Sequence, residues 1–462
     1  MRLSTLTLLQ PSQTGGASSI ADVTDDWPSM AQIIDTLTFQ AGHNTTMVIS
    51  GTTLLGLAAG IIGVFALLRK RSLMTDALSH ATLPGIALAF LFAASFGLNA
   101  KSLPVLLAGA TITGVLGVLC IQGILRFSRL REDAAIGIVL SVFFGAGIVG
   151  MSYIQANAAS RSGGLNHFIY GQAATMQPPD VILMGIIAGL AMLATLLFLK
   201  EFSLVCFNDA FAKVDGWPVS VIDLVMMALV VLVTVAGLQA VGLILVVALL
   251  IIPPVAARFW TERLWLLVLI AGLIGAASGY LGSSVSALFP RKPAGAVIVL
   301  TAGAIFAISM LLAPARGVIA IIIRRTNLRL KVGGDHLLEH AHELHQTTIS
   351  RDELRRVAKL RGWTPPFRFM IMLSLRIEGM LKSAAQRGVE LTDAGIERGA
   401  RVSRNHALWE QYLVSYADIA PSHVDWSVDL VEHVLSDELV HELEDRLRSR
   451  GVTLPDRKGV AS

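Results

Sequence analysis

The sequence is short of charged and aromatic side chains. Only 15% of its 462 residues are charged and 6% are aromatic, whereas 54% are hydrophobic. An average soluble domain carries about 25% charged residues, so this deficit excludes a disordered chain and argues against an ordinary soluble enzyme. Because aromatics are scarce, the apolar content comes from Leu, Ile, Val and Ala, as lipid-facing helices require.

The sequence also has few cysteines and no nucleotide-binding motif, which limits the kinds of site that it can form. The only cysteines, Cys120 and Cys206, provide neither a disulfide framework nor a thiolate metal site. No GxxxxGK[ST] motif occurs, so the chain has no loop that could cradle the phosphates of a nucleotide. We therefore expect it to bind no nucleotide of its own.

Long apolar stretches run from about Met47 to Ile323, and charged, amphipathic sequence follows. We predict three parts: a segment over 1–46, a transmembrane domain over 47–325 and a domain over 326–462. A bilayer core of about 30 Å needs roughly 20 apolar residues per helix. The pattern predicts about nine spans, of which the second is short: Met47–Leu68, Leu83–Phe96, Val105–Ile124, Ala134–Ile154, Val181–Leu199, Val221–Leu238, Val241–Ala257, Leu264–Leu281 and Ala294–Leu312. The sixth and seventh are divided at Gly237–Gln239, because one helix of their joint length would exceed the bilayer.

Basic residues alternate between the connecting loops. The loops after the first, third, fifth, seventh and ninth spans are richer in Lys and Arg than the others. The positive-inside rule therefore places the N-terminus and residues 1–46 outside and the C-terminal domain in the cytoplasm. This orientation needs an odd number of spans, and nine satisfies it.

One segment brings ionisable side chains to the membrane. In RSLMTDALSHATLPG, Asp76 and His80 are four residues apart and share one helical face. A carboxylate with an imidazole can bind a divalent first-row metal, and ionisable groups at membrane depth usually serve a function. The spacing equally allows a helix-end pair near the headgroups, where charge costs little.

Several segments resemble permease subunits of manganese, zinc and iron ABC importers: RKRSLMTDALSHATLPGIALAF, HFIYGQAATMQPPDV, FNDAFAKVDGWPVSVIDL, GLQAVGLILVVALLIIPPVAARF and KPAGAVIVLTAGAIFAISMLLAP. The resemblance covers roughly Trp27–Arg325. It implies that Asp76 and His80 coordinate the transported metal in a bacterial inner membrane. It also implies a homodimeric pore, an extracytoplasmic metal-binding protein and a separate ATPase subunit. This chain would then be a transport subunit and not an enzyme, with a cytoplasmic docking segment that includes Phe207, Asp209, Phe211 and Gly216.

The C-terminal part returns to soluble patterning. Asp335–His345 is dense in His and acidic residues, and helical periodicity follows over Thr348–Leu360 and Phe367–Lys382. RGVELTDAGIERGARV then predicts a short wing strand and a helix capped by Thr392 or Asp393. This order predicts a winged-helix domain with further helices. The overall fold class is thus an all-α polytopic membrane protein with a cytoplasmic winged-helix and helical metal-sensor-like domain.

LTDAGIERGARVSRNHALWEQYLV and DWSVDLVEHVLSDELVHELEDRL resemble the iron and manganese repressors typified by the diphtheria toxin repressor. That resemblance implies divalent-metal ligands at His406, Asp429, Glu432 and His433, and an accessory ligand at Glu410. The match is weaker further back, where it points to His336 and Glu339. An oxygen ligand at Asp429, in place of the sulfur typical of iron sensors, favours Mn²⁺ over Fe²⁺ or Zn²⁺.

The residues themselves support the later group. Asp429, Glu432 and His433 fall at i, i+3 and i+4, on one helical face. Two oxygens and an imidazole suit Mn²⁺ or Fe²⁺ better than Cu⁺. A solvated, charged helix face is the alternative interpretation.

The helix that should enter DNA is poorly equipped to read it. Pro366–Leu381 has few polar side chains to direct at base edges, so we do not expect DNA recognition. The sequence favours an ATP-driven importer of divalent metal, Mn²⁺ before Fe²⁺ or Zn²⁺, whose tail senses metal and regulates transport. Two alternatives stay open: a membrane-anchored metal-dependent transcription regulator and a proton-coupled secondary metal transporter.

Overall fold

The computed structural model describes residues 27–69, 72–97, 103–157, 176–289, 292–383, 388–416 and 437–449. Its contacts divide the chain into two compact units, Met1–Val318 and Ile319–Ser462. Each unit has a hydrophobic core of its own.

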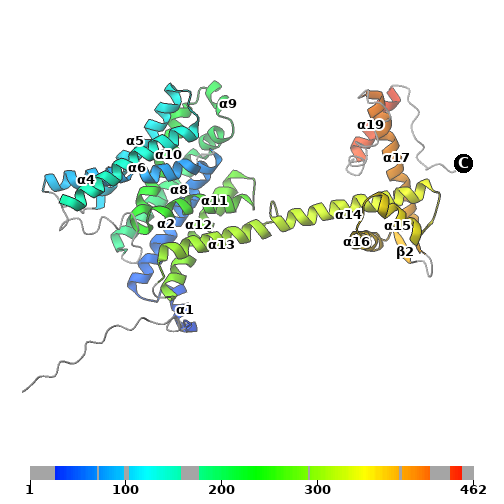
Figure 1. Cartoon of the computed structure of the whole chain (residues 1–462), viewed down its shortest axis with the longest axis horizontal. Coiled ribbons are helices and arrows are strands. Elements are labelled where there is room, and N and C mark those ends of the chain that lie inside the picture. Colours follow the sequence, from blue (N-terminus) through cyan, green and yellow to red (C-terminus); the bar gives the residue numbers. More distant parts are fainter. Residues whose placement is uncertain are drawn as a thin grey trace, which may run out of the picture. The chain divides into compact units, whose positions relative to one another are not determined.

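The first unit is a bundle of apolar helices (Figure 1). Within the described residues, eight helices are long and apolar enough to cross a membrane, and a ninth apolar helix, Leu245–Arg258, is shorter. This confirms a polytopic all-α membrane domain of about nine spans. The elements are α1 (Met30–Leu37), α2 (His43–Leu68), α3 (Ser72–Ala81), α4 (Leu83–Ser95), α5 (Leu103–Phe127), α6 (Glu132–Asn157), α8 (Pro178–Phe207), α9 (Asp209–Val214), α10 (Val219–Val241), α11 (Leu243–Arg258), α12 (Leu264–Leu288) and α13 (Ala294–Leu312).

Two boundaries differ from those that hydropathy predicts. The second span is not short, because α3 and α4 together form the 22-residue candidate span Met74–Ser95. Thr82 between them keeps a right-handed helical backbone, and its hydroxyl donates to the Ser79 carbonyl at 2.6 Å. The break between the sixth and seventh spans falls at Gly242 and not at Gly237–Gln239. Gly242 has a φ of 85°, which glycine adopts at low cost.

The centre of the first unit is α2, which packs against α8, α10, α11 and α12. Glycines let α2 and α12 approach backbone to backbone. A Cβ added at Gly56 would lie 2.1 Å from the Gly275 carbonyl oxygen, and one at Gly279 would lie 2.2 Å from the Thr52 carbonyl oxygen. Close contact between small residues is how helices associate where lipid supplies no hydrophobic driving force.

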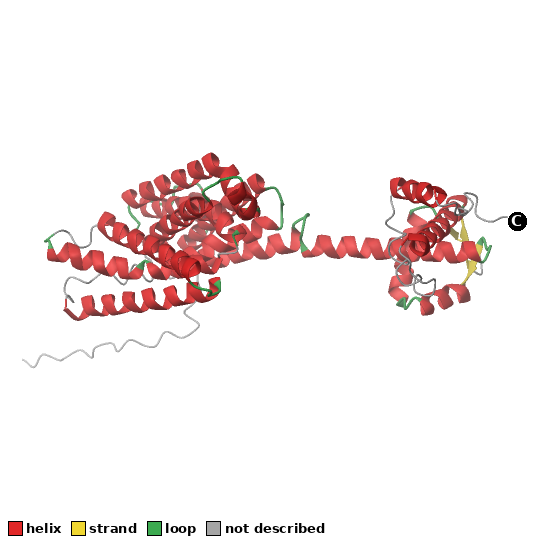
Figure 2. Ribbon diagram, turned by 90° about the horizontal axis from the view of Figure 1, so that it is seen from above, coloured by secondary structure: helices red, strands yellow, loops and turns green. Residues whose placement is uncertain are grey.

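The second unit combines helices with a small sheet, which contains the three strands found among the described residues (Figure 2). The strands pair antiparallel in the order β1-β3-β2, with Thr348 opposite Glu390 and Leu381 opposite Leu391. Two helices follow β1, and the β2–β3 hairpin forms the wing, so the predicted winged-helix fold is confirmed. The elements are α14 (Val318–Glu343), β1 (Thr348–Ser350), α15 (Arg351–Leu360), α16 (Pro365–Ile377), β2 (Leu381–Ser383), β3 (Gly388–Leu391), α17 (Asp393–Tyr416) and α19 (Asp437–Ser449).

Local capping sets the ends of these elements. Helical periodicity predicts a helix from Thr348, but α15 begins at Arg351, because Ser350 and Glu353 form a reciprocal capping box. The predicted helix Phe367–Lys382 ends earlier, and Gly379 follows it with a φ of 74°. Thr392 caps α17 as predicted, since its hydroxyl accepts from the Gly395 amide at 3.1 Å.

Candidate metal sites and the docking segment

Asp76 and His80 lie on α3, inside the candidate span Met74–Ser95. This helix packs against α5, α6, α10 and α11, so it runs within the bundle. Thr75 and Ser79 on the same helix are buried, and the Ser79 hydroxyl donates to the Thr75 carbonyl at 2.9 Å. The hydroxyl of Ser79 is therefore satisfied within its own helix, as membrane depth requires.

The two side chains face each other without a hydrogen bond. His80 Nε2 is 3.7 Å from Asp76 Oδ1, which is beyond hydrogen-bonding distance. The ring of Phe144 on α6 packs edge-to-face on the imidazole, with centroids 4.8 Å apart. His80 Nδ1 is buried and has no hydrogen-bond partner among the described residues. The side chain of Asp76 is 45% exposed, so it reaches the surface of the single chain.

The predicted docking segment forms the short helix α9 and the turn after it. Asn208 caps α9 by accepting from the Phe211 amide at 3.0 Å. Phe207 and Phe211 are 66% and 54% exposed, although both are aromatic. Of the other two predicted residues, Asp209 pairs with Lys213 along the helix, and Gly216 makes the turn with a φ of 85°. The segment thus presents apolar side chains outward at the end of α8.

In the tail, two helices bring together a carboxylate and two imidazoles. Glu339 and His336 lie on α14, and His406 lies on α17. Glu339 Oε2 is 3.6 Å from His336 Nδ1, and Glu339 Oε1 is 3.3 Å from His406 Nδ1. These residues border a cavity of about 210 Å³, together with His340, Glu343, Val357, Leu360 and Arg361.

The environment of Glu339 keeps it ionised. Burial alone would raise its pKa, but the adjacent imidazoles of His336 and His406 lower the pKa from 4.5 to about 2. An ionised carboxylate with imidazole nitrogens is a donor set that fits a divalent first-row metal. Glu339 contacts each of the two histidines. Among the residues that the structure describes, no group of three or more His, Cys, Asp or Glu is arranged to hold an ion. The trio therefore fits a metal by its chemistry and is not by itself a complete site.

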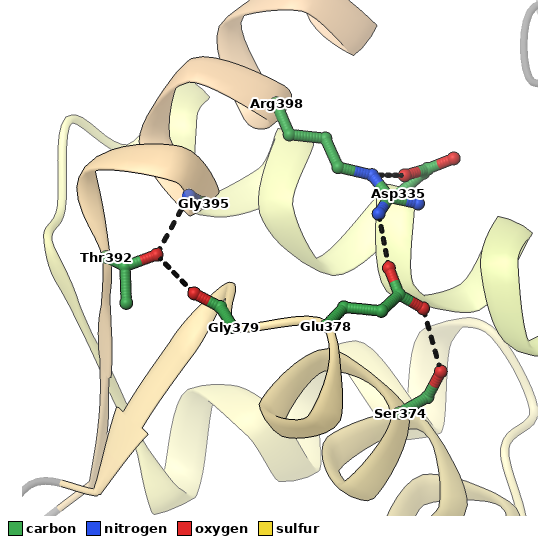
Figure 3. Close-up of polar contacts among 7 residues, drawn as sticks. All are labelled: Asp335, Ser374, Glu378, Gly379, Thr392, Gly395 and Arg398. Carbon is green, nitrogen blue, oxygen red and sulfur yellow. Dashed lines mark hydrogen bonds and ion pairs between the residues drawn. The ribbon is translucent and has the colours of Figure 1, made fainter.

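A second contact between α14 and α17 holds these two helices together (Figure 3). Arg398 Nε donates to Asp335 Oδ1 at 2.7 Å, and its Nη1 donates to Glu378 at the end of α16. Glu378 also accepts from the Ser374 hydroxyl at 3.0 Å. Asp335 lies one turn before Glu339 on α14. The Asp335–Arg398 ion pair, called the brace below, therefore helps to fix the position along α14 at which His406 of α17 contacts Glu339.

The remaining predicted ligands are not all placed. Glu410 lies one turn beyond His406 on α17 and is not among the residues that line the cavity. Asp429, Glu432 and His433 lie outside the described residues. Sequence reasoning missed the brace through Asp335 and Arg398, and it missed His340, Glu343 and Arg361 at the cavity. The density of His and Glu in Asp335–His345 was the available signal for two of them.

Comparison with known proteins identifies the class of membrane protein. Residues 43–313 match the ABC 3 transport family, and the chain belongs to it. Residues 392–452 match the iron dependent repressor, metal binding and dimerisation domain. Both resemblances found in the sequence are thereby confirmed.

Individual relatives span different parts of the chain. The manganese transport system membrane protein MntC of Bacillus subtilis is 38% identical over 90% of this chain and 94% of its own length, so the similarity continues into the tail. The zinc transport system membrane protein TroC of Treponema pallidum is 43% identical, over 61% of this chain and 93% of its own. A solved structure, PsaBC from Streptococcus pneumoniae in complex with Fab, is 33% identical with a TM-score of 0.53, and covers 62% of this chain and 98% of that one.

Proposed function

We propose that this chain is the membrane-spanning subunit of an ATP-driven importer of divalent transition metal. Manganese is the favoured substrate, ahead of iron and zinc. The observation that carries the proposal is the pair Asp76 and His80 inside a span of a chain from the ABC 3 transport family. A carboxylate and an imidazole 3.7 Å apart offer oxygen and nitrogen to a passing ion. The names of the relatives, manganese and zinc transport proteins, support the same substrate class.

The importer needs parts that this chain does not supply. Because the sequence has no phosphate-cradling loop, a separate subunit would hydrolyse ATP. The exposed aromatics around α9 support docking of that subunit. A second copy of the chain would complete the pore, and an extracytoplasmic metal-binding protein would deliver the ion. The positive-inside rule places the N-terminus outside and the tail in the cytoplasm.

We further propose that the tail senses cytoplasmic metal and regulates transport in the same chain. His336, Glu339 and His406 would contribute to its site, together with Asp429, Glu432 and His433, which lie outside the described residues. The match of residues 392–452 to a metal-binding and dimerisation domain supports this function. A bound ion would replace the contacts within the trio and thereby tie α14 to α17.

The substrate can be determined directly. The complex of this chain with its ATPase subunit would be reconstituted in proteoliposomes, and ATP hydrolysis measured across a panel of divalent ions. We expect stimulation by Mn²⁺ at lower concentrations than by Fe²⁺ or Zn²⁺, and none by Mg²⁺ or Ca²⁺. Uptake driven by a proton gradient without ATP would contradict the proposal and favour a secondary transporter.

Docking through α9 is tested by Phe211→Ala. Truncating an anchor residue of an interface costs about 1 kcal/mol or more, so if Phe211 is such an anchor the ATPase subunit should bind roughly fivefold more weakly. Binding to the detergent-solubilised chain would be measured by titration. Phe127→Ala is the matched control, because Phe127 is 87% exposed at the end of α5. Equal loss in both variants would show that α9 is not the docking segment.

A further inference from the structure

The outward face of α16 is apolar. This helix buries Ile371 and Leu375 in the core of the tail unit. On its other side, Phe369, Leu373 and Ile377 are 67%, 45% and 78% exposed. Their spacing of four residues places them in one stripe along the helix. A continuous exposed stripe of large apolar side chains is typical of a surface that binds a protein, a membrane or a ligand.

Basic residues are in excess in the sequence that carries this stripe. From Arg351 to Lys382 the chain carries eight Lys and Arg but only three Asp and Glu. Arg376 lies three residues after Leu373, on the same face of α16. The preceding helix α15 exposes three basic side chains and one leucine: Arg355, Arg356, Lys359 and Leu360. The winged-helix region thus joins apolar anchors with an excess of positive charge.

We propose that this face of the tail binds the surface of an anionic phospholipid membrane. Phe369, Leu373 and Ile377 would enter the boundary between headgroups and acyl chains. Arg376 and the basic residues of α15 would lie among the phosphates. Interfacial helices bind in this way, through buried apolar area together with attraction of Lys and Arg to anionic lipids.

The place of the tail in the chain supports a lipid partner. The last candidate span ends at Leu312, and the tail unit begins at Ile319. The tail is therefore covalently tethered to the membrane domain through α14, which also carries the first residues of the tail core. Such a tether keeps the local concentration of membrane surface high, and a modest affinity is then sufficient.

Charge and side-chain type disfavour two other partners. In a symmetric contact between two copies, the same positively charged faces would oppose each other, and juxtaposed like charges are costly. A DNA duplex would attract the cations, but base edges are read by Arg, Lys, Asn and Gln. The stripe instead presents Phe, Leu and Ile. An anionic bilayer complements both the apolar stripe and the excess of positive charge in this region.

The test uses the full-length chain, reconstituted at one copy per lipid nanodisc. Amide hydrogen exchange of α16 would be compared in discs of phosphatidylcholine and discs of equal parts phosphatidylcholine and phosphatidylglycerol. We expect exchange in α16 to be about fivefold slower in the anionic discs. The protection should fall in about 0.5 M NaCl, which screens surface charge.

The variant Phe369→Ser/Leu373→Ser/Ile377→Ser removes only exposed side chains and should abolish the protection. Leu344→Ser/Leu439→Ser is the matched control, since both residues are exposed in the same unit at 46% and 48%. Exchange of α17 reports whether each variant keeps its fold. Protection that is equal in both lipids, that needs two copies per disc, or that arises only with added duplex DNA would overturn the proposal.

Discussion

Replacing Asp76 with Asn is expected to reduce metal uptake by about 100-fold, since losing even an outer-shell partner of a metal ligand costs roughly 10–100-fold. Asn keeps the size of the side chain but removes the charge that attracts a cation. His80→Gln should have a similar effect, because Nε2 of His80 lies 3.7 Å from Asp76 Oδ1 and would be the second ligand of the ion. Uptake of radioactive Mn²⁺ into proteoliposomes containing the full complex measures both variants.

Two controls make this result specific. Asp133→Asn removes an exposed carboxylate at the start of α6 and should leave uptake unchanged. The amount of complex formed should match in all variants. The exposed side of Asp76 must also face the pore of a dimer and not lipid. If a thiol reagent confined to the bilayer modifies Asp76→Cys, or if D76N transports normally, then this pair does not bind the transported ion.

The second large effect is expected in regulation. Glu339→Gln should raise the internal Mn²⁺ concentration that halves uptake by at least about tenfold. The reason is that the carboxylate lies between two imidazoles and is ionised, with a pKa of about 2. A neutral amide of the same shape keeps the packing but removes the charge that a divalent ion requires. Uptake would be measured in vesicles preloaded with increasing Mn²⁺.

The matched control is Glu397→Gln, an exposed carboxylate on α17. Replacing Asp429, Glu432 and His433 together with Ala should abolish the shut-off, as the resemblance to metal-dependent repressors implies. Uptake without internal metal should be normal in every variant. Unchanged shut-off in both Glu339→Gln and the triple variant would show that the tail does not sense the ion.

Hydropathy was sufficient to predict the membrane fold. The span boundaries that it predicts are wrong where a span contains polar residues. The pattern of apolar residues places the second span at Leu83–Phe96, because Thr75, Asp76 and Ser79 lower the mean hydropathy of the preceding segment. In the structure that span begins at Met74. The hydroxyl of Ser79 donates to the Thr75 carbonyl of its own helix, which makes this side chain compatible with membrane depth. An average over residue types cannot represent such bonds.

The tail shows a different limit. The two helices, the wing strand β3 and the cap at Thr392 follow from local sequence, and the structure confirms them, whereas β1 and β2 lie in segments that the periodicity predicts to be helical. The meeting of Glu339 with His406 joins residues far apart in the chain, as does the brace between Asp335 and Arg398. Spacing within one helix does not determine such contacts, because they depend on how α14 and α17 pack. The sequence therefore named His336 and Glu339 only through a weak resemblance.

The glycine contacts of α2 and α12 have a mechanical consequence. Where Gly56 meets Gly275, carbonyl oxygens lie where side chains would otherwise fill the space. Where two helix backbones are in direct contact, no side chains lie between them that could change rotamer. We therefore expect α2 and α12 to move together as one rigid body. Any motion that opens the pathway alternately to each side would then occur elsewhere, as at Phe198, where α8 departs from helical geometry.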